Sequence, residues 1–275
     1  MQTAIRTMAM GTLIFACFLI SCSDSGSPRE GTPAYFWAAA KETFAASDYV
    51  KTVEHLERLT ANENEFTTRA RPWLLIMTSG TTRGYMDIAE SFDAGARATK
   101  TNPTAFRRTI NNYRAEANRT ALAFVQVFDQ FVKSKDELIP VALPFPTGGA
   151  SPVAQLSKAA AGTMLLPNEL EPAAKHAIER GVLLSACAAA GAPDDPAKTQ
   201  ELLKLGTLQV PRAAFMTAMA NTLFEESKLY GPRQIGNPER AKIFCMRALD
   251  ALKTVPETKQ TKELSSRITR SLKST

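Results

Sequence analysis

The spacing of apolar side chains is the feature that most constrains the fold of this 275-residue chain. In nearly every long segment, apolar residues recur at every third or fourth position, which is the period of an α-helix with one face turned to a core. No segment shows the sustained alternation and hairpin turns that are typical of strands. The sequence therefore predicts an all-α fold. The longest apolar stripe comprises Phe106, Ile110, Tyr113, Ala117, Ala121, Phe124, Val125, Phe128 and Phe131.

Capping residues indicate where several helices begin. Side chains that can cap a helix occur in Thr32-Pro33, Ser47-Asp48 and Asn102-Pro103. In the first and third of these pairs, the cap is followed by a proline, which suits the first turn of a helix. The short turns between successive apolar patterns favour antiparallel helical hairpins. We expect helices at residues 33–46, 48–59, 67–79, 85–99, 104–133, 153–165, 170–190, 197–205, 211–229, 238–253 and 257–272.

A proline-rich segment at residues 138–152 interrupts this pattern. It contains four prolines, which exclude a helix. Because its other residues are largely apolar, whereas free linkers are usually polar, we expect an extended strap that lies over a helical surface.

The amino-terminal segment carries an export pattern. An uncharged apolar run covers residues 8–20. Its last two residues and the next two form the sequence Leu19-Ile20-Ser21-Cys22. As a helix it would extend about 20 Å, which is short for a hydrocarbon core of about 30 Å. This pattern resembles the lipobox of bacterial lipoprotein signal peptides. The resemblance implies that residues 1–21 are removed and that acylated Cys22 anchors the protein to a lipid bilayer.

Two other interpretations of this segment stay open, namely an ordinary secretory signal cut nearby and an uncleaved anchor helix. For a lipoprotein, Ser23 after the acylated cysteine favours the outer membrane, with the protein facing the periplasm. Residues 22–31 are polar enough to predict a flexible tether, and residues 32–275 then form the helical domain.

The charge and cysteine content narrow the class of partner. A net charge of +6 favours anionic lipid headgroups or cell-wall polymers, but the basic residues are not concentrated as in nucleic-acid-binding proteins. An exported lipoprotein also does not normally meet nucleic acid, so we predict none as a partner. Cys187 and Cys245 lie on apolar helical faces, where they are either buried small residues or a disulfide pair.

Two segments resemble tetratricopeptide repeats. The sequence from Gly236 through Ala241 to Ala248-Leu249 matches the second helix of such a repeat, and residues 36–59 fit the same frame more loosely. The resemblance implies a non-catalytic interaction or assembly factor with an envelope protein as its partner. It places Trp37, Lys41 and Phe44 in a peptide-binding groove. Aromatic residues at helical spacing also commonly belong to the core, so this alternative stays open, and Trp73 is expected in the core.

The Gly-Asn-Pro-Glu-Arg-Ala sequence at residues 236–241 is also similar to the T-component lipoproteins of tripartite periplasmic (TRAP) transporters. That resemblance implies an alternative function, a solute-handling accessory lipoprotein of a transporter. A cavity between helix layers would favour it, whereas an open groove with exposed aromatic side chains would favour the interaction factor.

Catalytic and metal-binding patterns are weak. His55 and His176 do not form a zinc-binding pair, and we predict no metal, no cofactor and no catalytic residue. Glu90-Ser91-Phe92 resembles the glutamate-serine pair of lytic transglycosylases, which makes such an enzyme a remote alternative. The Gly-Leu-Met-Gln element expected next in that family is absent, and a solvated helix face explains Glu90 more simply.

Overall fold

The computed structural model describes residues 28–99, 103–141, 151–192, 195–204 and 206–274. The predicted signal segment, Cys22 and most of the tether lie outside these residues. Within them the fold is all-α, as predicted, and no helix of this described part is long and apolar enough to span a bilayer. The helices are α1 (Pro33–Ala45), α2 (Tyr49–Thr60), α3 (Thr67–Ala98), α4 (Pro103–Phe131), α5 (Ala154–Ala160), α6 (Pro167–Ala189), α7 (Pro196–Lys204), α8 (Arg212–Ser227), the 3₁₀ helix η1 (Lys228–Tyr230), α9 (Pro238–Lys253) and α10 (Lys259–Ser274).

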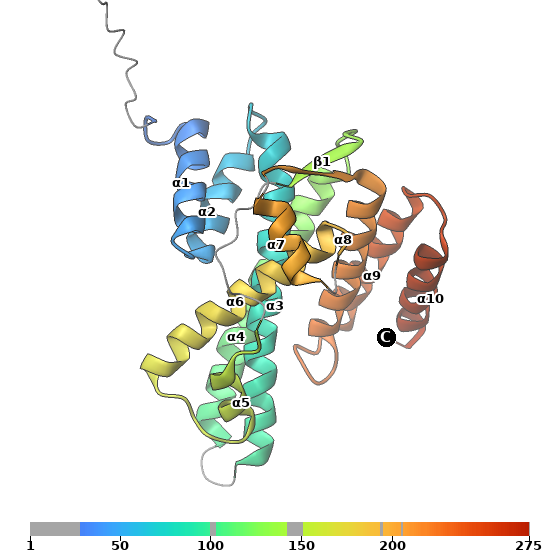
Figure 1. The fold of residues 1–275 in the computed structure, drawn as a ribbon. Helices are drawn as coiled ribbons and strands as arrows, with labels where there is room; N and C mark the ends of the chain where they lie inside the picture. The colour runs from blue at the N-terminus through green and yellow to red at the C-terminus, as the bar shows by residue number, and fades with distance from the viewer. Residues whose placement is uncertain (1–27, 100–102, 142–150, 193–194, 205, 275) are drawn as a thin grey trace, which may run out of the picture.

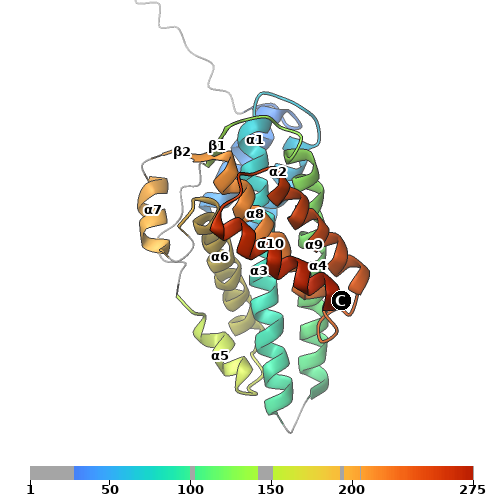
Figure 2. The same ribbon diagram turned by 90° about the vertical axis from the view of Figure 1, so that its right-hand side faces the viewer.

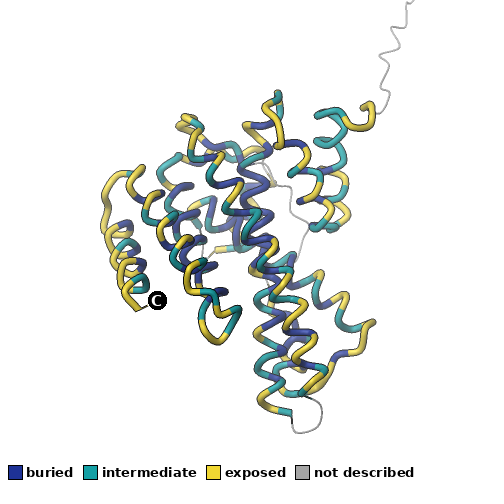
Figure 3. The backbone as a smooth tube through the Cα atoms, turned by 180° about the vertical axis from the view of Figure 1, so that it is seen from behind, coloured by how far each residue is buried: buried dark blue, intermediate teal, exposed yellow. Residues whose placement is uncertain are grey.

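The two longest helices, α3 and α4, pack side by side along the length of the molecule (Figure 1). The α1–α2 hairpin packs on the first turns of α3, and α5 packs near its other end. On a further side of α3, α6 crosses it. Helices α8, α9 and α10 follow one another as a layer beside this centre (Figure 2). Buried residues gather on the central helices, whereas α10 and the connections are mostly exposed (Figure 3).

Helix α3 corrects one prediction, because its 32 residues run without a break where the sequence indicated two helices. The expected break lay at residues 80–84, which begin and end with glycine. In the structure, Gly80 and Gly84 lie at the crossing with α6. A Cβ atom at Gly80 would lie 2.3 Å from the Val182 Cα, and one at Gly181 would lie 2.1 Å from the Gly80 carbonyl oxygen. These glycines therefore permit backbone-to-backbone packing of two helices.

The first residues of the proline-rich segment are extended, as predicted, and form strand β1 (Leu138–Val141). This strand pairs antiparallel with β2 (Leu208–Pro211), a pairing that the sequence did not indicate. Ile139 and Val141 are buried, and the strand packs on α3 and α8. The strap prediction for residues 142–150 lies outside the described residues.

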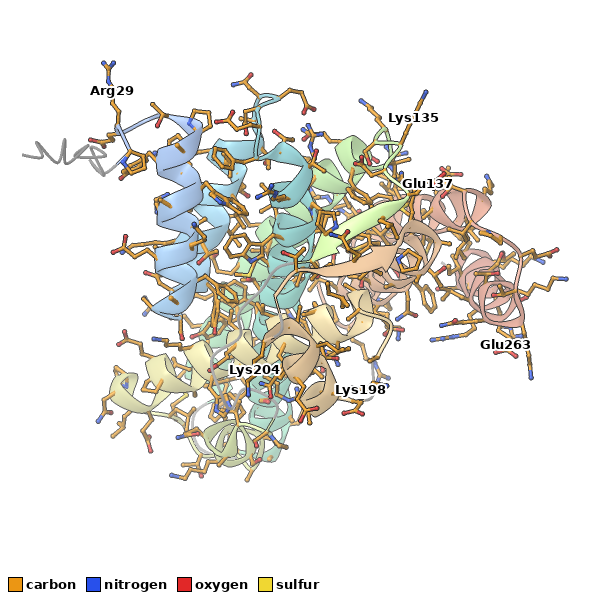
Figure 4. All side chains as sticks on the ribbon, turned by 45° about the horizontal axis from the view of Figure 1, so that its top comes forward. Arg29, Lys135, Glu137, Lys198, Lys204 and Glu263 are labelled. Carbon is orange, nitrogen blue, oxygen red and sulfur yellow. The ribbon has the colours of Figure 1, made fainter. Side chains whose placement is uncertain are left out.

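Cys187 on α6 and Cys245 on α9 are both buried as free thiols, which corresponds to the first of the two alternatives for them. Charged side chains project outward from several different elements, as the labelled residues show (Figure 4). These are Arg29, Lys135, Glu137, Lys198, Lys204 and Glu263, all of which are exposed.

Candidate functional site: a polar cleft between α3, α6 and α8

The three predicted groove residues do not form one accessible surface. Phe44 is 1% exposed and meets Trp73 edge-on, which corresponds to the core alternative for this residue. Trp37 is partly buried, stacks on Phe66 at 5.6 Å between ring centroids, and also meets Trp73. Lys41 is exposed, with its Nζ 5.9 Å from the Trp37 ring. The aromatic residues of α1 thus attach the hairpin to α3, because burying their rings stabilises the contact.

A cleft of about 520 Å³ lies elsewhere, between α3, α6 and the carboxyl end of α8. These elements are neighbours in the fold (Figure 1). Their lining side chains are mostly polar, with Met86, Leu184 and Ala188 as an apolar part of the wall. The polar members are Ser79, Arg83, Asp87, Glu90, Ser185, Asn221, Thr222, Glu225, Glu226 and Lys228.

Glu226 is the unusual member of this lining. Its residue is 4% exposed, and both carboxyl oxygens are buried without a hydrogen-bond partner among the described residues. Burial raises the pKa of Glu226 well above its ordinary value, because a desolvated carboxylate is unfavourable. Burial therefore favours the protonated, neutral form of this carboxyl group. A buried carboxyl that lines a cleft and lacks a partner is a strong indication of a functional site.

Helical periodicity explains why Glu226 is buried. Phe215, Met219 and Leu223 form the buried face of α8, and Glu226 follows on that face, with Tyr230 four residues further on. The sequence around Glu226 does not mark it as a site, because Glu225 and Lys228 beside it give the pattern of a charged helix end. Its place on the apolar stripe was the signal that could have identified it.

Two other acidic groups of the cleft, Asp87 and Glu225, are paired with cations. Arg180 donates from Nη1 to Asp87 Oδ2 at 2.9 Å. Burial raises the pKa of Asp87, and the nearby Arg180 guanidinium partly offsets this. At the other side of the cleft, Glu225 forms ion pairs with Lys228 and, at 3.4 Å, with Arg267.

Glu90, the residue of the transglycosylase alternative, is exposed and lines the same cleft. Partial desolvation raises its pKa, and the negative charge of Asp87 raises it further. The two histidines lie away from this cleft, His55 on α2 and His176 on α6, and both are partly buried. In the part of the chain that the structure describes, no group of three or more His, Cys, Asp or Glu side chains could hold a metal ion.

A second hollow of about 520 Å³ lies next to the cleft, between α6, α8 and α10. Ala188 and Asn221 line both spaces. In the second hollow, α8 presents small side chains, including Ala214 and Ala218, which leave room above the helix.

Helix α9 begins as the sequence indicated. Gly236 has a φ of 72°, and the Asn237 side chain accepts a hydrogen bond from the Arg240 N–H at 3.1 Å.

No protein-family model, curated protein or solved structure matches the chain. The tetratricopeptide and lipoprotein assignments therefore stay predictions, and an assignment of function rests on the cleft and on the sequence patterns.

Proposed function

We propose that this protein is a membrane-anchored binding protein that faces the periplasm and holds a small polar molecule in the cleft between α3, α6 and α8. The lipobox-like sequence supports an anchor at acylated Cys22. The protein acts by binding, without catalysis and without a cofactor.

The observation that carries this proposal is the unpartnered carboxyl group of Glu226 at the cleft. Leaving a buried polar group without a partner costs about 1–3 kcal/mol. A bound molecule that supplies the missing hydrogen bonds would offset this cost. The position of the cleft between helix layers favours the solute-handling alternative over a peptide groove at Trp37 and Lys41, where the structure places Phe44 in the core.

A second candidate function is the docking of a partner protein, as in an assembly factor. It is favoured by Ile243 and Met246, which lie one turn apart on α9 and are 49% and 56% exposed. Adjacent exposed apolar side chains of this kind are common at protein contacts. This surface is separate from the cleft, so docking and binding could coexist.

The test is a thermal-shift screen of small polar molecules on the full-length protein in detergent. A ligand at 100 times its Kd stabilises the folded state by about 2.7 kcal/mol, which raises Tm by about 5–10 °C for a chain of this size. Ala188→Trp should abolish this shift, because the indole would fill the space that Ala188 borders.

The matched control is Ala115→Trp, on an exposed position of α4 outside the cleft, which should keep the full shift. A ligand that stabilises the wild-type protein and the Ala188→Trp variant equally would place binding elsewhere and contradict the proposal.

A further inference from the structure

The charges around the cleft do not all balance. Asp87 and Glu225 have cationic partners, whereas Glu90 and Glu226 form no ion pair among the described residues. Arg83 is the cation of the described lining that forms no ion pair. Its side chain is exposed, so water screens its charge. Two carboxyl groups of the lining thus have no ion-pair partner among the described residues, and one of them, Glu226, is buried.

The surroundings of Glu226 contain the groups that would influence its charge. Helix α3 contributes Arg83, Asp87 and Glu90 to the lining, and the end of α8 with η1 contributes Glu225 and Lys228. These five residues complete the charged members of the described lining.

Helix α6 adds only uncharged residues to the lining, namely Leu184, Ser185 and Ala188. The hydroxyl of Tyr230, one turn after Glu226, is also buried without a partner among the described residues. Burial raises the pKa of Tyr230, and the ionised form of Glu226 would raise it further.

We propose that the ligand is a small organic cation, an amine or amidine, whose charged head binds the carboxylate of Glu226 in place of the carboxyl proton. This inference rests on the proposed function and names the ligand class of the same cleft. On binding, the O–H bond of the Glu226 carboxyl breaks and the proton passes to solvent. The net charge of the buried site is unchanged, because the cation replaces the proton.

The hydrogen-bonding chemistry favours a cation over an anion. An ionised carboxylate only accepts hydrogen bonds, and an ammonium group brings up to three donors that satisfy both of its oxygens. An anion at the same place would lie near Asp87, Glu90 and Glu225, and it would accept only the single hydrogen bond that the protonated Glu226 carboxyl donates. Met86 and Leu184 offer contacts to an apolar part of the ligand.

The affinity of the cleft for a cation should depend on pH. Because the cation competes with a proton for Glu226, affinity should rise with pH until Glu226 is ionised in the free protein. Below that pH, each unit should strengthen binding about tenfold, and about one proton should be released for each cation bound.

The test uses three probes of similar size and different charge: 2-phenylethylamine, 2-phenylethanol and phenylacetate. Their Kd values are measured by saturation-transfer NMR on the full-length protein in detergent at pH 5, 6 and 7. We expect the amine to bind most tightly, with a Kd that falls about tenfold from pH 5 to pH 6. Glu226→Gln should weaken amine binding at least tenfold at pH 7 and remove its pH dependence. The control Glu239→Gln, whose side chain on α9 is 78% exposed, should behave as the wild-type protein.

Tighter binding of the alcohol or the acid, or a pH-independent Kd of the amine, would overturn the inference. The proposed function would survive that result if other molecules still stabilised the wild-type protein but not Ala188→Trp in the thermal-shift screen. If Glu226→Gln folds poorly, the pH dependence of the Kd of the amine for the wild-type protein still tests whether the ligand is a cation.

Discussion

Glu226, in the last turn of α8, has a carboxyl group that is buried from water and has no hydrogen-bond donor among the described residues. An apolar residue of similar size would avoid the cost of burying this group without a partner. Native proteins rarely keep such groups except where function requires them. The unfavourable burial of Glu226 is therefore best explained by the binding that we propose.

The raised pKa of Glu226 predicts a specific pH dependence of stability. The unfolded chain releases this proton near the ordinary pKa of 4.5, whereas the folded protein keeps it to higher pH. The stabilising contribution is thus complete below pH 4.5 and is lost as pH rises toward the folded-state pKa, by about 1.4 kcal/mol per unit. The side chain introduced by Glu226→Gln cannot ionise. The free energy of unfolding of this variant, relative to that of the wild-type protein, should therefore rise by that amount for each pH unit above 4.5.

Urea unfolding of both proteins at pH 4.5, 5.5 and 6.5 measures this difference. Glu239→Gln, on an exposed site, should differ from the wild-type protein by a constant within about 0.5 kcal/mol. Parallel pH profiles of Glu226→Gln and the wild-type protein would show that Glu226 is hydrated in solution.

At the scale of elements, the crossing of α3 and α6 sets one side of the cleft. The contact depends on Gly80, Gly84 and Gly181, where the two backbones are too close for a Cβ atom. Ser79 and Arg83 on α3 line the cleft beside this crossing. The distance between the helices therefore sets the width of the cleft.

We predict that Gly181→Ala destabilises the protein by about 1–3 kcal/mol, because its Cβ would lie 2.1 Å from the Gly80 carbonyl oxygen and force the helices apart. Helix propensity alone would stabilise this variant by about 1 kcal/mol, so the sign of the change is informative. Urea unfolding measures it. Glu171→Ala, on an exposed position of the same helix, should change stability by less than about 0.5 kcal/mol, and a stabilised Gly181→Ala would refute the close crossing.

Local signals predicted most of the helices, and tertiary contacts explain the differences. The caps at Thr32 and Asp48 are present as expected, because capping depends on nearby backbone groups. The cap expected at Asn102 lies outside the described residues. The expected break at residues 80–84 is absent, because packing against α6 outweighs the low helix propensity of glycine. The β1–β2 pairing joins segments about 70 residues apart, for which the sequence carries no local signal.

The candidate site was harder to predict for a related reason. The cleft combines side chains from three helices that are distant in sequence, and no motif marks their meeting. Glu90 was noticed for a different reason, a resemblance to an enzyme family. For Phe44 the sequence leaves a groove and the core open, because a helical stripe alone does not distinguish them, and the residue is buried.

At the scale of the whole molecule, the cleft lies between the central helices and the layer of α8, α9 and α10. Polar contacts hold this layer on α4: Arg247 pairs with Asp129 at 2.8 Å, and Arg240 donates to Asn118 at 2.9 Å. Because α9 packs on α8, these contacts also position Glu226 opposite α3. The site thus depends on how the two parts of the fold pack together.

The most direct test of the central claim is native mass spectrometry of the protein extracted from the membrane fraction. We predict a chain that begins at Cys22 with the added mass of its acyl groups, and one small molecule bound to the wild-type protein but absent from Ala188→Trp. An unacylated chain would contradict the anchor. An acylated chain with no bound molecule, or with the same molecule in both proteins, would contradict binding in the cleft.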